Sequence, residues 1–208
     1  MYFLELLGFY AAKSKLEVMS YSLMTNHVHL IAVPRREDSL ANALKPVHMC
    51  YSQRLNKVGG KIGINWQGRF FSSPMDEVYT WHALKYIMLN PVTAKIESRF
   101  ENYPWSSARA HLGLETNPYL NANREWLEIA AAAVRELREE LKEGNSFKCQ
   151  AQFDEIIKLT NSNLPIGSET FIDRLEKLAG RRLTLGKPGR RTIRSVGEAA
   201  GASDLKIG

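Results

Sequence analysis

The chain has 208 residues, of which 44% are hydrophobic, with a formal net charge of +6 and a pI near 9.3. This length suits one well-cored domain with an appendage, and the basic balance favours a polyanionic partner, with a merely basic protein as the alternative. Cys50 and Cys149 lack disulfide-framework or zinc-site spacing, and no apolar run approaches the ~20 residues that cross a bilayer. We therefore expect a cytoplasmic protein with no membrane partner.

The first part of the chain begins with a helical pattern and continues with an extended one. Apolar residues recur at helical spacing over residues 2–12, which predicts an amphipathic helix. Residues 16–23 and 27–33 then alternate apolar and polar side chains around a short connection, which predicts a β-hairpin.

The second strand of this hairpin carries a pair of histidines. Because side chains alternate along a strand, His27 and His29 should project from one face, with their rings side by side. Two neutral imidazoles held at nearly fixed separation suit a divalent metal ion. The alternative is a pair of polar residues on the solvated face of an amphipathic strand, because the pattern is short.

A helix, a loop and an extended segment follow the hairpin. The apolar spacing predicts a helix over residues 39–56 that Pro46 could kink, then a glycine-rich loop over 57–65 and an extended segment over 66–78. The loop either contacts a nucleic-acid backbone or is a plain connector, and Arg69 either holds a phosphate or guanine or faces solvent. The candidates for nucleic-acid binding in this stretch are Lys57, Lys61, Gln67 and Arg69.

The next helix combines a phenol and a carboxamide. We expect this helix to end at about Asn90, because Pro91 pushes the preceding residue away from helical geometry. Tyr86 and Asn90 are four residues apart, so their side chains share one face.

Four blocks of sequence occur in a recognisable order and spacing. They are His27-Val28-His29, Trp66-Gln67-Gly68-Arg69-Phe70, Tyr86-Ile87-Met88-Leu89-Asn90-Pro91-Val92 and Tyr103-Pro104-Trp105-Ser106-Ser107. Together they resemble the REP-associated tyrosine transposases, which are small single-tyrosine members of the HUH transposases. The resemblance covers residues 16–113, about half of the chain.

The resemblance implies a fold and a chemistry. The order of elements fits an α+β sandwich, and the family implies its ferredoxin-like version, an antiparallel sheet with helices on one face. The family normally has a strand ahead of the first helix, so we expect either a sheet without its first strand or a start placed too late. In the family mechanism the two histidines and Asn90 hold Mg²⁺ or Mn²⁺, and Tyr86 attacks DNA to leave a 5′-phosphotyrosine link. The implied substrate is single-stranded DNA beside hairpin or palindromic repeats, bound by a monomer or a homodimer.

The remainder of the chain reads as an appendage and a tail. We expect a catalytic domain over residues 1–115, a helical C-terminal region over 116–180 and a basic flexible tail over 181–208. Basic tails of this kind commonly track phosphates. Its candidate nucleic-acid-binding residues are Arg181, Arg182, Arg190 and Arg191.

Two other functions stay open at this point. One is a catalytically inactive DNA- or RNA-hairpin-binding regulator derived from such a transposase. The other is a metal-dependent nuclease that uses water in place of Tyr86.

Overall fold

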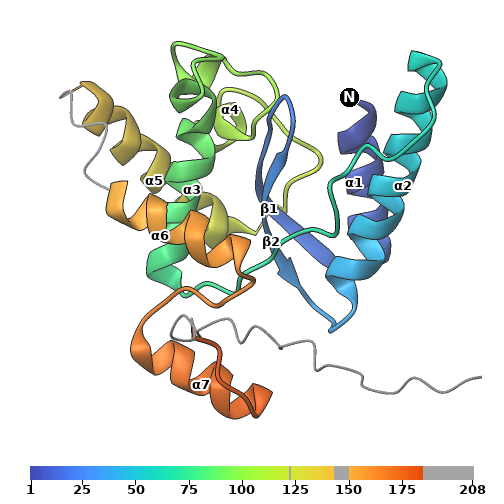
Figure 1. Ribbon diagram of the computed structural model, residues 1–208. Helices are drawn as coiled ribbons and strands as arrows, with labels where there is room; N and C mark the ends of the chain where they lie inside the picture. Colours follow the sequence, from blue (N-terminus) through green and yellow to red (C-terminus); the bar gives the residue numbers. More distant parts are fainter. Residues whose placement is uncertain (122, 143–149, 185–208) are drawn as a thin grey trace, which may run out of the picture.

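The computed structural model describes residues 1–121, 123–142 and 150–184 (Figure 1). Its elements are α1 (Tyr2–Lys13), β1 (Leu16–Leu23), β2 (Val28–Pro34), α2 (Ser39–Gly59), α3 (Glu77–Thr93), the 3-10 turn η1 (Phe100–Asn102), α4 (Ala108–His111), α5 (Arg124–Lys142), α6 (Gln150–Asn161) and α7 (Glu169–Ala179). The helix and the hairpin predicted at the start of the chain are both present. None of the described helices is long and apolar enough to cross a membrane.

A two-stranded antiparallel ribbon forms the centre of the molecule. β1 pairs with β2 so that Tyr21 lies opposite Leu30 and Ser22 opposite His29, with an irregularity between Val18 and Ser20. The prediction of an α+β fold with an antiparallel sheet is confirmed. Among the described residues the sheet has these two strands.

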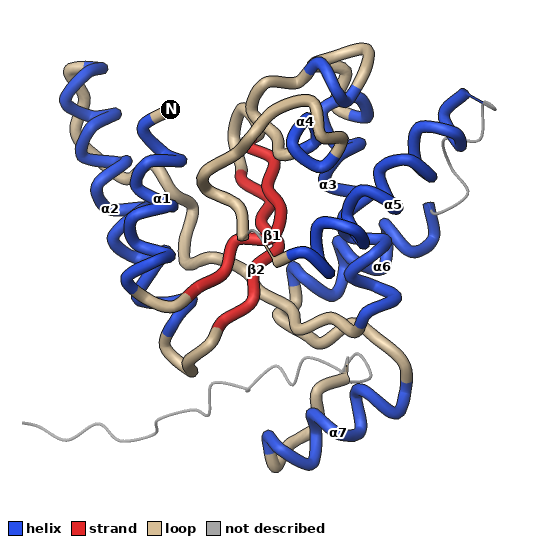
Figure 2. Tube along the Cα trace, turned by 180° about the vertical axis from the view of Figure 1, so that it is seen from behind, coloured by secondary structure: helices blue, strands red, loops and turns tan. Residues whose placement is uncertain are grey.

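Helices cover both faces of the ribbon, whereas the resemblance implied helices on one face. Met19, Ile31 and Val33 pack with α3 and α5, while the alternating residues Leu30 and Ala32 pack with α1 and α2. Figures 1 and 2 show the ribbon standing between these two groups of helices. The physical reason is that both faces carry apolar side chains, so each face must be shielded from water.

Later parts of the chain cover the outer edge of β1. An exposed strand edge presents unpaired backbone groups to other chains, so proteins usually protect it. The protecting bonds are Leu23 N to Trp105 O (2.9 Å), Ser107 N to Tyr21 O (3.0 Å), Asn121 N to Val18 O (2.7 Å) and Trp126 Nε1 to Met19 O (2.8 Å). The edge on this side of the ribbon is therefore bonded along most of its length.

Three predicted boundaries were wrong. α3 runs to Thr93 rather than ending at Asn90, because Pro91 lacks only its own N–H while its carbonyl still accepts from Ile96 N at 2.9 Å. α2 extends to Gly59, so Lys57 lies on the helix and not in the loop. Residues 66–75 follow an irregular path instead of a regular extended one, and only Met75 forms a bridge, with Ile166.

A buried ion pair joins α3 to α5. The side chain of Lys85 is 1% exposed, and its Nζ lies 2.6 Å from Glu136 Oε1 and 3.1 Å from Glu140 Oε1. Around it, residues from both sides of the expected boundary at residue 115 share one core, among them Leu84 and Val134. The division into units at that point stays a prediction.

Removing this lysine should destabilise the protein. We expect Lys85→Ala to lower the free energy of unfolding by about 3 kcal/mol, because the glutamates lose their partner and a cavity opens. Lys142→Ala is the matched control, since the Lys142–Glu139 pair is exposed and should contribute less than about 0.5 kcal/mol. Urea denaturation measures both, and equal losses in the two variants would contradict the stabilising role of Lys85.

Candidate active site

The turn of the hairpin brings two imidazoles to the face of the ribbon that α3 covers. Met24 N donates to His27 O at 2.9 Å, which closes the turn, and β2 begins at the next residue. His29 is on the strand two positions before Ile31 and therefore shares its face. His27 lies just ahead of the strand, with its ring directed at the same point.

The two rings and a carboxamide from α3 converge. The Nε2 atoms of His27 and His29 are 2.9 Å apart, and the ring centroids are 4.6 Å apart at an interplanar angle of 87°. Nδ2 of Asn90 lies 3.0 Å from Nε2 of His29. Three polar groups from two elements thus meet within hydrogen-bonding distance.

Tyr86 completes the cluster from one helical turn away. Its ring centroid lies 5.2 Å from that of His29, at an angle of 77°. On its other side the ring packs against Phe153 of α6, with centroids 5.5 Å apart. The structure therefore brings together His27, His29, Tyr86 and Asn90, with the phenol partly accessible.

Burial controls the protonation of these groups. Burial, followed by the nearby His27, lowers the pKa of His29 to about 4, and burial also lowers the pKa of His27. Both rings are consequently neutral at neutral pH, with a lone pair free for a cation. Burial raises the pKa of the Tyr86 phenol, and the neighbouring Asn90 carboxamide acts in the opposite direction. A phenolate at this position needs further stabilisation by positive charge.

The spacing of the donor atoms fits a divalent cation. Two ligand atoms at right angles around an ion at about 2.1 Å are about 3 Å apart, and the two Nε2 atoms are 2.9 Å apart. A half-turn of the Asn90 carboxamide presents its oxygen to the same point, since the two ends of this group have nearly the same shape. In the described part of the chain no three His, Cys, Asp or Glu side chains form a metal-binding group, so a metal held by the two imidazoles would need a third ligand of another kind, such as the amide.

Sequence reasoning missed Asn26. Its Oδ1 accepts a hydrogen bond from Nδ1 of His27 at 2.7 Å, which fixes the tautomer that leaves Nε2 free. Residues that orient a histidine ligand in this way strengthen its binding to metal. The signal available was its position next to His27, but an asparagine in a turn is ordinarily explained by backbone geometry alone.

We expect Asn26→Ala to weaken Mn²⁺ binding by about tenfold to a hundredfold, because the His27 ring loses its fixed tautomer and orientation. Asn26→Asp keeps the acceptor oxygen and should retain most of the affinity. Calorimetric titration with Mn²⁺ measures both variants, and an unchanged affinity in the alanine variant would show that Asn26 does not orient His27.

The candidates for nucleic-acid binding lie on the surface, away from this cluster in sequence. Trp66 anchors its block by donating from Nε1 to His48 O at 3.1 Å, and the neighbouring Gln67 and Arg69 are exposed. Arg181 and Arg182 are exposed just after α7. The other candidates are Lys57 and Lys61, which are exposed, and Arg190 and Arg191, which lie outside the described residues.

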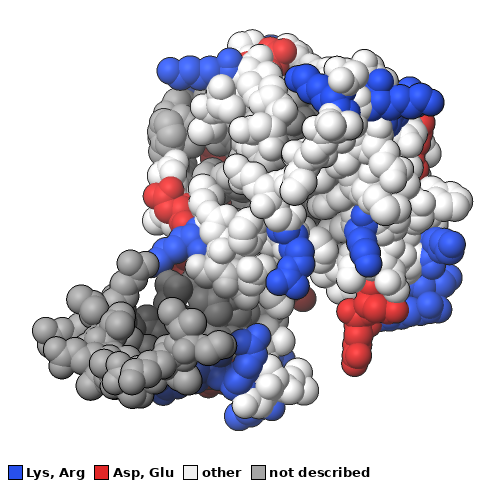
Figure 3. Space-filling model, turned by 45° about the vertical axis from the view of Figure 1, so that its right-hand side comes forward, with Lys and Arg blue, Asp and Glu red and all other residues white. Residues whose placement is uncertain are grey.

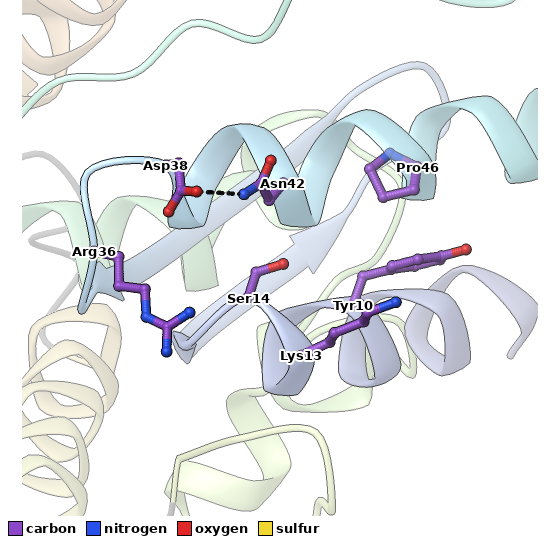
Figure 4. Close-up of a pocket in the computed structure, with 7 residues that line it drawn as sticks. All are labelled: Tyr10, Lys13, Ser14, Arg36, Asp38, Asn42 and Pro46. Carbon is purple, nitrogen blue, oxygen red and sulfur yellow. Dashed lines mark hydrogen bonds between the residues drawn. The ribbon is translucent and has the colours of Figure 1, made fainter.

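A polar pocket of about 330 Å³ lies between the end of α1 and the start of α2 (Figure 4). Lys13 and Arg36 line it, together with Asp38, whose carboxylate accepts from Asn42 at 2.6 Å. The pocket adjoins the start of β1 and the end of β2, whereas the imidazoles stand at the turn between these strands. It shares no residue with the four-residue cluster.

Residues 2–90 match the family model for IS200-like transposases. This segment, which is less than half of the chain, is therefore similar to the IS200-like transposases. The match includes the two histidines and ends at Asn90, and it implies a transposase with a DNA substrate and, in general, a divalent metal. Neither a curated protein nor a solved structure matches the chain. The REP-associated subgroup stays a resemblance within the IS200-like family.

Proposed function

We propose that this protein is a transposase that cleaves and rejoins single-stranded DNA beside hairpin or palindromic repeats. The observation that carries the proposal is the meeting of Tyr86 with His27, His29 and Asn90, with the phenol one helical turn from the carboxamide. The IS200-like segment supports the reaction class. We assign the two histidines and Asn90 as ligands for Mg²⁺ or Mn²⁺ and Tyr86 as the nucleophile.

The reaction exchanges one phosphoester for another. The Tyr86 oxygen attacks phosphorus, forming the tyrosine O–P bond as the bond from phosphorus to the 3′ oxygen breaks. The phenol releases its proton, and the departing oxygen takes up a proton to become a 3′-hydroxyl. A cation held by His27, His29 and Asn90 would neutralise the charge that gathers on the phosphoryl oxygens and would favour the phenolate.

The packing around Tyr86 serves this chemistry. His29 on one side and Phe153 on the other confine the ring, so the oxygen is positioned before substrate arrives. The 5′-phosphotyrosine keeps the energy of the broken bond, and attack by another 3′-hydroxyl rejoins the strand without ATP.

We further propose that residues 1–115 form the catalytic unit, that 116–180 support it, and that the tail from 181 tracks DNA phosphates. Phe153 of the C-terminal region packs against the Tyr86 ring, which supports the second of these roles. A homodimer that shares the same DNA substrate is compatible with this arrangement.

The chief alternative is a regulator that binds DNA or RNA hairpins without cutting. The observation in its favour is the two-stranded sheet of the described residues, which is smaller than a ferredoxin-like sheet. The intact cluster of four side chains favours the enzyme.

Incubation with hairpin-bearing single-stranded DNA and Mn²⁺, followed by denaturing electrophoresis, separates these functions. The transposase gives a protein–DNA adduct that EDTA prevents. Binding without an adduct indicates the regulator, and cleavage without an adduct indicates a nuclease that uses water.

A further inference from the structure

The stretch from Ser39 to Met75 has an unusual charge composition. It contains no Asp or Glu, although the whole chain has 22, and it carries the basic residues Lys45, Arg54, Lys57, Lys61 and Arg69. This stretch comprises α2 and most of the connection to α3. Figure 3 brings the side of α1 and α2 forward and shows Lys and Arg side chains spread over it, together with some Asp and Glu side chains. Such a surface attracts a polyanion more strongly than it attracts a partner that carries charges of both signs.

The end of this helix forms a built projection, which we call the α2 tip (residues 56–65). Gly60 has a left-handed backbone (φ 60°), which reverses the chain after the last helical turn. Asn56 then ties the loop back to the helix, since its Nδ2 donates to Gly63 O at 2.9 Å and its Oδ1 accepts from Asn65 Nδ2 at 2.9 Å. The tip therefore presents its side chains in a defined arrangement.

Branched aliphatic side chains stand out from this tip into solvent. Ile62 is 100% exposed, Ile64 is 93% exposed and Val58 is 78% exposed. Water disfavours apolar surface of this kind, so its burial against a partner is favourable. Lys57 and Lys61 lie beside these residues, and neither forms an ion pair with any part of the chain that the structure describes.

The position of the tip relates it to the catalytic cluster. Figures 1 and 2 show the C-terminal end of α2 at the same end of the molecule as the turn between β1 and β2, where the imidazoles stand. A DNA strand held at the cluster could therefore extend towards the tip. A second copy placed tip to tip would instead bring Lys57 and Lys61 of both copies together, which is unfavourable.

We propose that the α2 tip is a wedge for duplex DNA. Ile62 and Ile64 pack against an unpaired or terminal base step of a hairpin stem, and Lys57 and Lys61 neutralise the phosphates on either side. Aliphatic side chains inserted at such steps are a known way to grip deformable DNA. The identity of this DNA as a hairpin rests on the proposed function.

The test measures equilibrium binding of the full-length protein by fluorescence anisotropy, in EDTA so that no strand is cut. The probes are a synthetic hairpin with an imperfect stem and a single-stranded flank, and the flank alone. We expect Ile62→Ser/Ile64→Ser to weaken hairpin binding about tenfold, with little effect on the flank and the same salt dependence. Ile62→Val/Ile64→Val should restore affinity, and Leu178→Ser, an 84% exposed leucine on α7, should be neutral.

The lysines give an independent readout. Lys57→Gln/Lys61→Gln should reduce the slope of log K against log salt by about two, because each lysine neutralises one phosphate. In addition, 2-aminopurine can be placed beside the imperfection in the hairpin stem. Its fluorescence should increase when the wild-type protein binds and should stay unchanged when the Ile62→Ser/Ile64→Ser variant binds.

Three outcomes overturn the wedge. They are unchanged hairpin affinity in the serine variant, an equal loss on the flank alone, and a change of oligomeric state in DNA-free sedimentation, which assigns the tip to a second copy. These readouts do not involve Tyr86, so failure of adduct formation refutes the proposed strand transfer and leaves the wedge standing. Conversely, failure of the wedge leaves the adduct experiment unaffected.

Discussion

Tyr86→Phe should abolish covalent attachment to DNA and reduce strand cleavage by at least about a thousandfold, because the nucleophilic oxygen is removed. The phenylalanine ring keeps the contacts with His29 and Phe153, so the fold and DNA binding should be retained. Denaturing electrophoresis of the DNA product measures the first effect, and anisotropy measures the binding.

Tyr79→Phe is the matched control for this variant. Tyr79 lies on the same helix two turns earlier, and its hydroxyl donates to Glu155 rather than facing the imidazoles. Adduct formation should persist in this variant. Cleavage that survives Tyr86→Phe at the wild-type rate would assign the reaction to water and not to the phenol.

His29→Ala should have the second largest effect. His29 stands between Asn90 and His27 and touches the Tyr86 ring, so its removal takes away a proposed metal ligand and part of the wall around the proposed nucleophile. Mn²⁺ affinity should fall by about a hundredfold or more, and adduct formation should fall with it. Calorimetric titration and the adduct assay measure the two effects.

The control for the His29→Ala variant changes another histidine, which lies on the same face of α3 as Tyr86. His82→Ala, four residues before Tyr86, removes an imidazole that lies outside the cluster and should leave Mn²⁺ affinity unchanged. Equal losses of Mn²⁺ affinity in the two variants would remove the assignment of His29 as a ligand.

Local patterns in the sequence predicted the pieces of the site but not their assembly. Alternation along the strand predicted over residues 27–33 placed the histidines together, and the spacing of four placed Tyr86 beside Asn90, because both patterns depend only on backbone geometry. The histidine pair and the Tyr86–Asn90 pair approach each other because of the way α3 packs on the ribbon. Only the resemblance suggested this approach. The structure supplies it through the packing of Ile31 and Val33 with α3.

The sequence was least informative where tertiary packing overrides local preference. Pro91 is a strong stop signal, yet the helix continues past it because the residue is buried against the core and its carbonyl remains bonded. Both faces of the ribbon carry apolar side chains, but we followed the resemblance, which implied helices on one face, and so did not predict the second layer. Contacts from distant segments, such as Phe153 on Tyr86, leave no local signal.

The proposed reaction is tested most directly by locating the DNA-linked residue. After incubation with hairpin-bearing single-stranded DNA and Mn²⁺, the protein is digested with protease and nuclease, and the nucleotide-bearing peptide is sequenced by mass spectrometry. We predict a nucleotide joined through its 5′-phosphate to Tyr86. Attachment at any other residue, or efficient cleavage with no nucleotide on the protein, would contradict the assignment of Tyr86 as the nucleophile.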